Sequence, residues 1–191
     1  IWFAVLLMAL FLFGFATGTW HYNYFDLPLW HSHEMVFGYA VAIIAGFLLT
    51  SVRNWTGLAT PSGLSLAFLA LLWLAPRVLS STPIPAYMFA MLDILFLPLL
   101  ALLLGRLILK AKQPRNYPVP VLLLLLALCN TAVHLEVLGL FEHISHQAIQ
   151  IAVCLMVAFI ALIGGRVVPF FMQRTAGRKP EASQSINCCY I

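Results

Sequence analysis

Long apolar runs alternate with short polar segments along the chain, and this pattern predicts a helical membrane protein. The clearest run, Met35–Val52, has 18 residues and no charged side chain. A helix of that length spans the apolar core of a bilayer, which is about 30 Å thick. We therefore predict an all-α fold, a polytopic transmembrane helix bundle of six spans, at Ile1–Thr17, Glu34–Val52, Gly57–Leu79, Ala86–Gly105, Val119–Leu138 and Ser145–Gly164.

The first and third runs and the tail depart from this regular pattern. Ile1–Thr17 has neither the basic start nor the small-residue cleavage site of a signal peptide, so we expect a shortened transmembrane helix. The third run carries Pro61, which suits the first turn of a helix, but its clean apolar part ends before Pro76 and Arg77. We predict one six-helix transmembrane domain over residues 1–174 and a disordered tail over residues 175–191.

The composition excludes a soluble domain, since 63% of the residues are hydrophobic and only 8% are charged. The net charge of +4 is shared unevenly, because Lys and Arg gather after the second, fourth and sixth predicted spans. Cytoplasmic loops of membrane proteins carry such an excess, so we expect the lipid bilayer as a partner and no nucleic acid. In this orientation Arg77 is the one basic residue on the non-cytoplasmic side.

Familiar catalytic motifs do not occur in the sequence. The four cysteines form no CxxC pair, and we find no phosphate-binding loop, no GxSxG and no zinc-protease motif. The sequence therefore gives no indication of hydrolysis or nucleotide binding.

The six histidines all fall at the predicted non-cytoplasmic ends of the spans. Imidazole is a ligand for both iron and copper, so this clustering predicts a metal or haem site at that surface. We expect His21 to be an ordinary interfacial residue. The candidate ligands are the other five: His31, His33, His134, His143 and His146.

Two arrangements are open for His31 and His33. If a helix begins before His31, the two side chains point about 200° apart and cannot bind one ion. If the segment is extended, they point the same way and can share an ion. Helical spacing also aligns Gly38, Ala42 and Gly46 on one face, where such small residues admit either a closely packed helix or a flat macrocycle.

Polar residues recur at helical spacing in the last two predicted spans. In the fifth, Asn130 and His134 lie one turn apart. A polar stripe on a membrane helix is expected to face the bundle interior or a cavity. The sixth span predicts such a stripe, formed by His143, His146, Gln150 and Cys154.

Carboxylates accompany the histidines. Glu34, Glu136 and Glu142 lie at the same predicted level and are expected to orient the imidazoles by accepting their second N–H. Asp93 lies inside the fourth span, five residues before Pro98. Its partner is either a backbone group freed by a kink at Pro98 or the side chain of Arg77. An intramembrane carboxylate of this kind serves either a functional site or helix packing.

Four segments of the chain together resemble the NnrS family of bacterial membrane proteins. The most specific is HSHEMVFGYAVAIIAGFLLTSVRNWTG, residues 31–57. The others are MLDILFLPLLALLLGR (91–106), LCNTAVHLEVLG (128–139) and IALIGGRVVPFF (160–171). The resemblance covers about residues 1–174. The positions that match the family are His31, His33, Glu34, Arg53, Asn54, Asp93, His134, Arg166 and Pro169.

The resemblance implies a polytopic inner-membrane protein that contains haem and copper and acts in nitric oxide metabolism and the nitrosative-stress response. Because family members are longer, we expect this chain to be the N-terminal half of their architecture. If the other half supplies ligands, the chain alone is expected to be inactive.

We therefore predict a haem- and copper-binding membrane protein whose ligand is nitric oxide or another small diatomic molecule. The charge pattern puts its histidine cluster on the periplasmic side of the bacterial inner membrane. The predicted haem or metal ligands are His31, His33 and His134, with His143 and His146 as further metal ligands. The residues predicted to support these ligands are Glu34, Glu136 and Asp93.

Two alternatives from other functional classes stay open. One is a membrane oxidoreductase of the haem–copper nitric oxide reductase type, in which Asp93 would belong to a proton path. The other is half of a transporter, in which Asp93 and Gln150 line a pathway and the histidines sense pH. The sequence leaves open whether the protein is an enzyme, which residues would be catalytic and how the chain oligomerises.

Overall fold

The computed structural model describes residues 2–18, 24–79 and 84–175 of the chain. Within these ranges every regular element is a helix and there is no strand, which confirms the all-α prediction. The chain forms two compact units, Ile1–Met156 and Val157–Ile191, and all contacts discussed below lie within the first. His21 and the predicted disordered segment after Thr175 lie outside the described residues.

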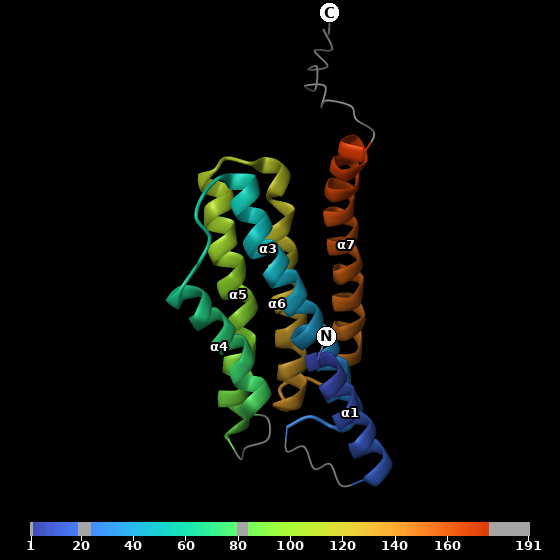
Figure 1. The fold of residues 1–191 in the computed structure, drawn as a ribbon. Helices are drawn as coiled ribbons and strands as arrows, with labels where there is room; N and C mark the ends of the chain where they lie inside the picture. The colour runs from blue at the N-terminus through green and yellow to red at the C-terminus, as the bar shows by residue number, and fades with distance from the viewer. Residues whose placement is uncertain (1, 19–23, 80–83, 176–191) are drawn as a thin grey trace, which may run out of the picture. The chain divides into compact units, whose positions relative to one another are not determined.

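The first unit is a bundle of helices that run up and down beside one another (Figure 1). A π-helical segment, η1, continues α2 into α3, and a short 3-10 helix, η2, precedes α6. The elements in chain order are α1 (Trp2–Thr17), α2 (Leu27–His33), η1 (Glu34–Ala40), α3 (Val41–Thr56), α4 (Leu64–Leu79), α5 (Ala86–Lys110), η2 (Pro114–Asn116), α6 (Pro118–Val137) and α7 (Ser145–Thr175).

A multi-pass membrane protein is confirmed by the length and composition of the helices. Within the described residues, four helical segments are long and apolar enough to cross a membrane: Leu27–Thr56, Ala86–Lys110, Pro114–Val137 and Ser145–Gly165. Six spans are not confirmed. Helices α1 and α4 have 16 residues each. At 1.5 Å per residue such a helix is about 24 Å long, shorter than the apolar core of a bilayer.

The second span begins at Leu27, so its predicted start at Glu34 is wrong. Asp26 caps this helix, because its Oδ1 accepts a hydrogen bond of 2.8 Å from the backbone N–H of Leu29. Pro28 is tolerated in the first turn, where its missing N–H has no helical partner to lose. The cap lies outside the apolar run, so the hydropathy pattern does not reveal it. The helical segment therefore already includes His31 and His33.

The third predicted span, Gly57–Leu79, also begins at a different residue. Gly57 (φ +68°) ends α3 with a hydrogen bond from its N–H to the carbonyl of Arg53, and Gly63 (φ +57°) precedes α4. These left-handed positions suit glycine and hold residues 57–63 in a loop. Helix α4 begins only at Leu64, after Pro61 rather than at it.

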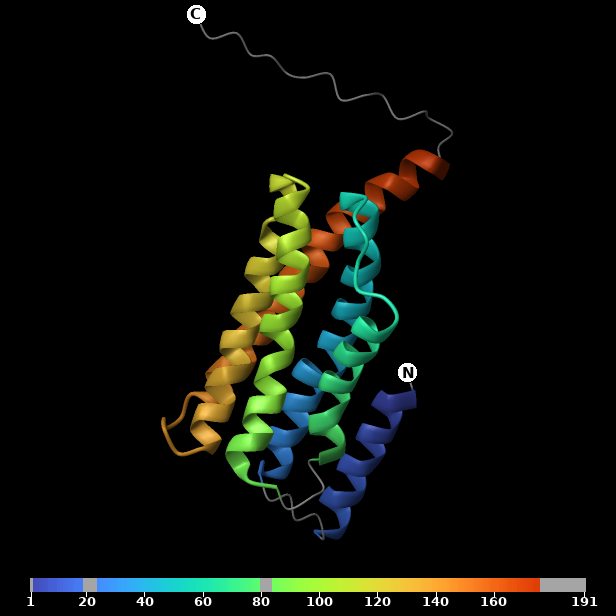
Figure 2. The same ribbon diagram turned by 90° about the vertical axis from the view of Figure 1, so that its left-hand side faces the viewer.

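Helix α5 is the centre of the first unit, since it packs against α3, α4 and α6 (Figure 2). One buried side of α5 includes Leu97, Leu100, Leu104 and Ile108, each 2% exposed or less. Gly105 faces Pro120 of α6, and a methyl group added at Gly105 would lie in van der Waals contact with it, 3.4 Å from Cβ of Pro120. This packing places Asp93 of α5 between α4 and α6.

Candidate metal centre

Three buried side chains from different helices meet near one end of the bundle. His33 comes from the end of α2, Asp93 from α5 and His134 from α6. Their exposed fractions are 0%, 3% and 0%, and one potential ligand atom from each lies within 4.8 Å of the others. The Oδ2 atom of Asp93 is 3.4 Å from Nε2 of His33 and 3.1 Å from Nε2 of His134.

Local structure explains why these side chains converge. The early start of α2 places His33 in the last turn of an α-helix, before the wider turns of η1. Asp93 lies about two turns inside α5, so it is nearer the end of the span than its middle. Asn130 and His134, one turn apart on α6, both face Asp93, with Nδ2 of Asn130 donating a hydrogen bond of 2.9 Å to Oδ2.

Arg77 joins the cluster from α4. Its Nη1 lies 2.8 Å from Oδ1 of Asp93, and its Nε donates a hydrogen bond of 3.2 Å to Oε2 of Glu34. Nη1 also donates to the backbone carbonyl of Trp73. Arg77 is therefore the partner of Asp93, as one of the two sequence alternatives predicted. Its pairing explains why a basic residue stands on the side that is otherwise poor in Lys and Arg.

The cluster sets two carboxyl groups and two imidazoles around one guanidinium. Glu34 and Asp93 are both 3% exposed, and Arg77 is the guanidinium that faces them. An unpaired buried charge costs several kcal/mol, so two ionised carboxyl groups require a second positive charge beside Arg77. Either a protonated imidazole or a cation bound between His33 and His134 would supply that charge.

Tyr24 controls the orientation of His134. Its Oη lies 2.8 Å from Nδ1 of His134. Burial, together with the charge of Asp93, raises the pKa of the Tyr24 hydroxyl, so this group keeps its proton. It can donate to Nδ1, or accept from an Nδ1–H and leave Nε2 free for a metal. Hydrogen bonds of this second kind typically fix metal-bound histidines.

Glu34 occupies the space beside Gly38. A Cβ at Gly38 would collide with Oε2 of Glu34, so only glycine admits the carboxylate against the helix at this position. Oε1 of Glu34 lies 3.8 Å from Nδ1 of His33, which is close enough for an ion pair but too long for a hydrogen bond. Gly38 therefore makes room for the Glu34 carboxylate. This explains the small residue at one of the three positions, Gly38, Ala42 and Gly46, that share a helix face.

His31 does not join His33. Because α2 begins at Leu27, the two residues lie about 200° apart on one helix, and the alternative in which they share an ion is wrong. His33 is fully buried and points into the cluster, whereas His31 is only half-buried. The assignment of His31 as a ligand of some other site stays a prediction.

The polar stripe of α7 lies on an exposed surface. His143, His146, Gln150 and Cys154 are all exposed, so the prediction that this stripe faces the interior of the bundle is wrong for this chain. Nε2 of His146 lies 3.0 Å from Nε2 of Gln150. The assignment of His143 and His146 as metal ligands stays a prediction, because neither belongs to the buried group.

Glu136 caps the start of α7. Its Oε2 accepts hydrogen bonds of 2.6 Å and 2.7 Å from the backbone N–H groups of Ile144 and Ser145. A carboxylate at a helix N-terminus is favoured by the helix dipole. The structure therefore gives Glu136 a capping role, whereas Asp93, predicted to support the ligands, lies among them.

Sequence reasoning did not assign a role at the site to Tyr24 or Asn130. Tyr24 has the signal of an interfacial aromatic residue and no more. Asn130 carried a usable signal, since it lies one turn from His134 inside an apolar span. A buried amide there needs a polar partner, and the structure supplies two: Asp93 and His33, whose Nε2 lies 2.8 Å from Oδ1 of Asn130.

The geometry suits a single metal ion. Two ligand atoms about 2.1 Å from a tetrahedral ion are about 3.4 Å apart, close to the separations of 3.1 Å and 3.4 Å around Oδ2 of Asp93. Two imidazoles and a carboxylate are donors that copper and iron both accept. The residues of the cluster therefore fit a transition-metal ion of either kind.

Haem does not fit between the same side chains. The rings of His33 and His134 are 5.3 Å apart at an angle of 77°, and both face one carboxylate oxygen. Phe25 packs 4.8 Å and 5.7 Å from the two rings. Axial histidines must face each other across a macrocycle, and the space between these two is filled by Asp93, Asn130 and Phe25.

The model of the family described as NnrS protein matches residues 1–188 of the chain. The chain belongs to the NnrS family. This result confirms the resemblance and extends it beyond residue 174. NnrS proteins are membrane proteins linked to the nitric oxide response. No curated protein and no solved structure matches the chain. The functional assignment of individual residues therefore depends on the geometry above.

Proposed function

We propose that this NnrS protein binds one transition-metal ion, copper, through His33, Asp93 and His134, and serves the nitric oxide response through that ion. The observation that carries the proposal is the buried group of three potential ligands, in a cluster where two carboxyl groups face one guanidinium. Sites with nitrogen and oxygen donors bind Cu²⁺ most tightly among the first-row divalent ions, which favours copper over iron. A bound copper ion would supply redox and Lewis-acid chemistry toward a small diatomic ligand such as nitric oxide.

Each neighbouring residue has a distinct role in this proposal. Arg77 holds Oδ1 of Asp93 and leaves Oδ2 directed at the two imidazoles. Tyr24 orients His134, and Asn130 would release the Nε2 atom of His33 when the ion enters. Because Asp93 is engaged by several partners, the contacts favour a closed binding site over an open transport pathway.

The membrane arrangement is part of the proposal. The alternation of Lys and Arg favours an inner-membrane protein with the histidine cluster on the periplasmic side. We propose six crossings, with α1 and α4 as the two short ones. The first part of the span Leu27–Thr56, the end of α4 and the end of α6 all contribute to the cluster, which agrees with this up-and-down order (Figure 1).

The decisive experiment is metal analysis of the purified protein and of three variants, one of them a control. We expect His33→Ala and His134→Ala each to lose bound copper, because each removes one of the three ligands. His31→Ala, on the same helix as His33 but turned away, is the control and should keep the wild-type copper content. Elemental analysis and copper electron paramagnetic resonance provide the readouts.

Two results would contradict the proposal. Equal copper content in all three variants would show that the metal lies elsewhere. A wild-type protein that binds no transition metal would leave the cluster as a structural network. A reduced-minus-oxidised spectrum recorded in parallel tests for haem, whose bands should persist in His33→Ala if any haem is bound away from this cluster.

A further inference from the structure

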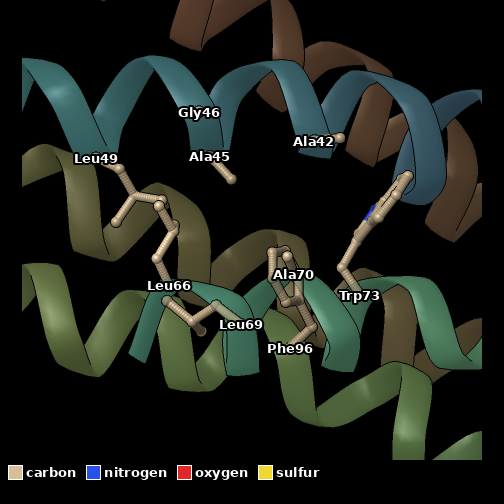
Figure 3. Close-up of a pocket in the computed structure, with 9 residues that line it drawn as sticks. All are labelled: Ala42, Ala45, Gly46, Leu49, Leu66, Leu69, Ala70, Trp73 and Phe96. Carbon is tan, nitrogen blue, oxygen red and sulfur yellow. The ribbon is translucent and has the colours of Figure 1, made fainter. Parts of the chain in front are cut away.

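An apolar cavity lies between α3 and α4, inside the part of the bundle that lipid would surround (Figure 3). Its volume is about 170 Å³. Its lining residues are all apolar, and the indole nitrogen of Trp73 is the polar side-chain atom among them. The lining residues are Ala42, Ala45, Gly46 and Leu49 of α3, Leu66, Leu69, Ala70 and Trp73 of α4, and Phe96 of α5.

Small residues on both helices leave this space unfilled. A Cβ added at Gly46 would meet no atom within 4 Å, and Ala70 faces it from α4. The inner wall is buried, with Leu69 and Phe96 exposed by only 3% and 6%. Gly46 and Ala70 themselves are exposed. The cavity is therefore open toward the lipid side and closed toward the core.

The closed end adjoins the buried cluster. Trp73 lines the cavity, and its Nε1 donates a hydrogen bond of 3.1 Å to the carbonyl of Gly38. The guanidinium carbon of Arg77 lies 5.3 Å from the centre of the Trp73 ring, and Arg77 reaches Glu34 and Asp93. Phe96 stands three residues after Asp93 on α5. One layer of side chains thus separates the cavity from the cluster.

We propose that this cavity binds a small apolar gas molecule and admits it from the bilayer to the metal cluster, with Trp73 as the barrier between them. An enclosed apolar cavity of about 150 Å³ stays dry and binds xenon or benzene, and this cavity has a similar volume and lining but opens toward the lipid, from which an apolar gas can enter. Water gains nothing in such a space because it finds no polar partners. The role as a route depends on the proposed function, whereas gas binding does not.

Xenon separates gas binding in the cavity from the route to the cluster, because xenon binding needs no metal. Crystals of the whole protein held under xenon pressure should show one anomalous peak between Gly46, Ala70 and Trp73. Gly46→Leu should abolish the peak, since its side chain enters open space and should leave the fold intact. Ala70→Leu fills the same cavity from the other helix. Ala161→Leu, on an exposed position of α7, is the matched control and should keep the peak.

The rate at which nitric oxide reaches the copper-loaded protein tests the route. In stopped-flow measurements, Gly46→Leu and Ala70→Leu should slow association while leaving copper content unchanged, and Ala161→Leu should do neither. An absent xenon peak, or continuous density of a lipid chain in the cavity, would overturn gas binding. An unchanged association rate in both filled variants would overturn the route. If the protein binds no copper, the proposed function fails, yet the xenon result still decides whether the cavity binds gas.

Discussion

The buried cluster and the polar stripe of α7 use similar residues in opposite settings. The cluster draws His33, Asp93 and His134 from three helices and hides each of them from solvent. The stripe takes His146 and Gln150 from one helix and leaves both exposed. In the cluster each imidazole contacts a carboxylate, whereas in the stripe His146 contacts only an amide among the interactions described.

The difference shows what turns polar residues into a candidate metal site. An exposed histidine remains hydrated and needs no particular neighbour. A buried imidazole or carboxylate loses its water, so the fold must supply partners from other elements. Here α4 supplies Arg77, α6 supplies Asn130 and the segment before α2 supplies Tyr24. Both the cost of desolvation and the need for partners fix which residues can form the cluster. Substitutions in the cluster should therefore change stability and metal content far more than substitutions in the stripe.

Asp93→Asn should have the largest effect. The variant keeps the size of the side chain but removes the charge that faces Arg77, which is itself buried. Breaking a buried ion pair from one side costs about 3–5 kcal/mol. We expect the free energy of unfolding in detergent to fall by about this amount and copper binding to be lost. Thermal or denaturant unfolding and elemental analysis provide the measurements.

Glu142→Gln is the matched control for this change, because Glu142 is exposed. It should leave both stability and copper content unaltered. Similar stability losses in the two variants would mean that the pairing of Asp93 with Arg77 is not what stabilises the cluster.

Tyr24→Phe should have an intermediate effect that is confined to the metal. The hydroxyl contacts Nδ1 of His134, and loss of such a contact typically lowers metal affinity about 10- to 100-fold. The ring contacts of Tyr24 with Phe25 and Phe89 remain, so the fold should persist. Titration against a copper chelator measures the affinity.

Tyr87→Phe removes a hydroxyl from a side chain that is 61% exposed and serves as the control. If the two variants bind copper equally well, Tyr24 does not orient His134. The buried cluster would then depend on its neighbouring side chains less than its contacts suggest.

The fold was predictable where a physical requirement repeats along the chain. A span needs a long apolar run, so Met35–Val52 and the runs of α5, α6 and α7 indicate helices directly. Starts and ends were less predictable, because single residues determine them. The cap at Asp26 lies outside any apolar run, and the glycines at 57 and 63 shorten α4 from its predicted start. The hydropathy pattern does not register a left-handed residue.

The site was predictable residue by residue but not as an assembly. His33, His134 and Asp93 each stood out because a polar group in a membrane span is costly. Their meeting depends on contacts between residues far apart in the chain, such as Asp93 and His134, which are 41 positions apart, and a single sequence does not show such contacts. Arg77 appeared as an exception to the charge pattern and as one of two alternative partners of Asp93, and the structure adds its second carboxylate partner, Glu34. The prediction that the α7 stripe faces the bundle interior was wrong, because helical spacing shows that residues share a face but not what packs against that face.

His146→Ala should have the smallest effect. It changes the exposed stripe, whereas the earlier variants change the buried cluster. Its contact with Gln150 is exposed, and substitutions at such positions usually change stability by less than about 0.5 kcal/mol. Copper content should equal that of the wild type, whereas His134→Ala on the neighbouring helix should lose the metal. If His146→Ala lost as much copper as His134→Ala, the exposed stripe would have to bind metal in the native membrane. Burial would then no longer distinguish the two regions, and a partner covering α7 would have to supply what this chain leaves open.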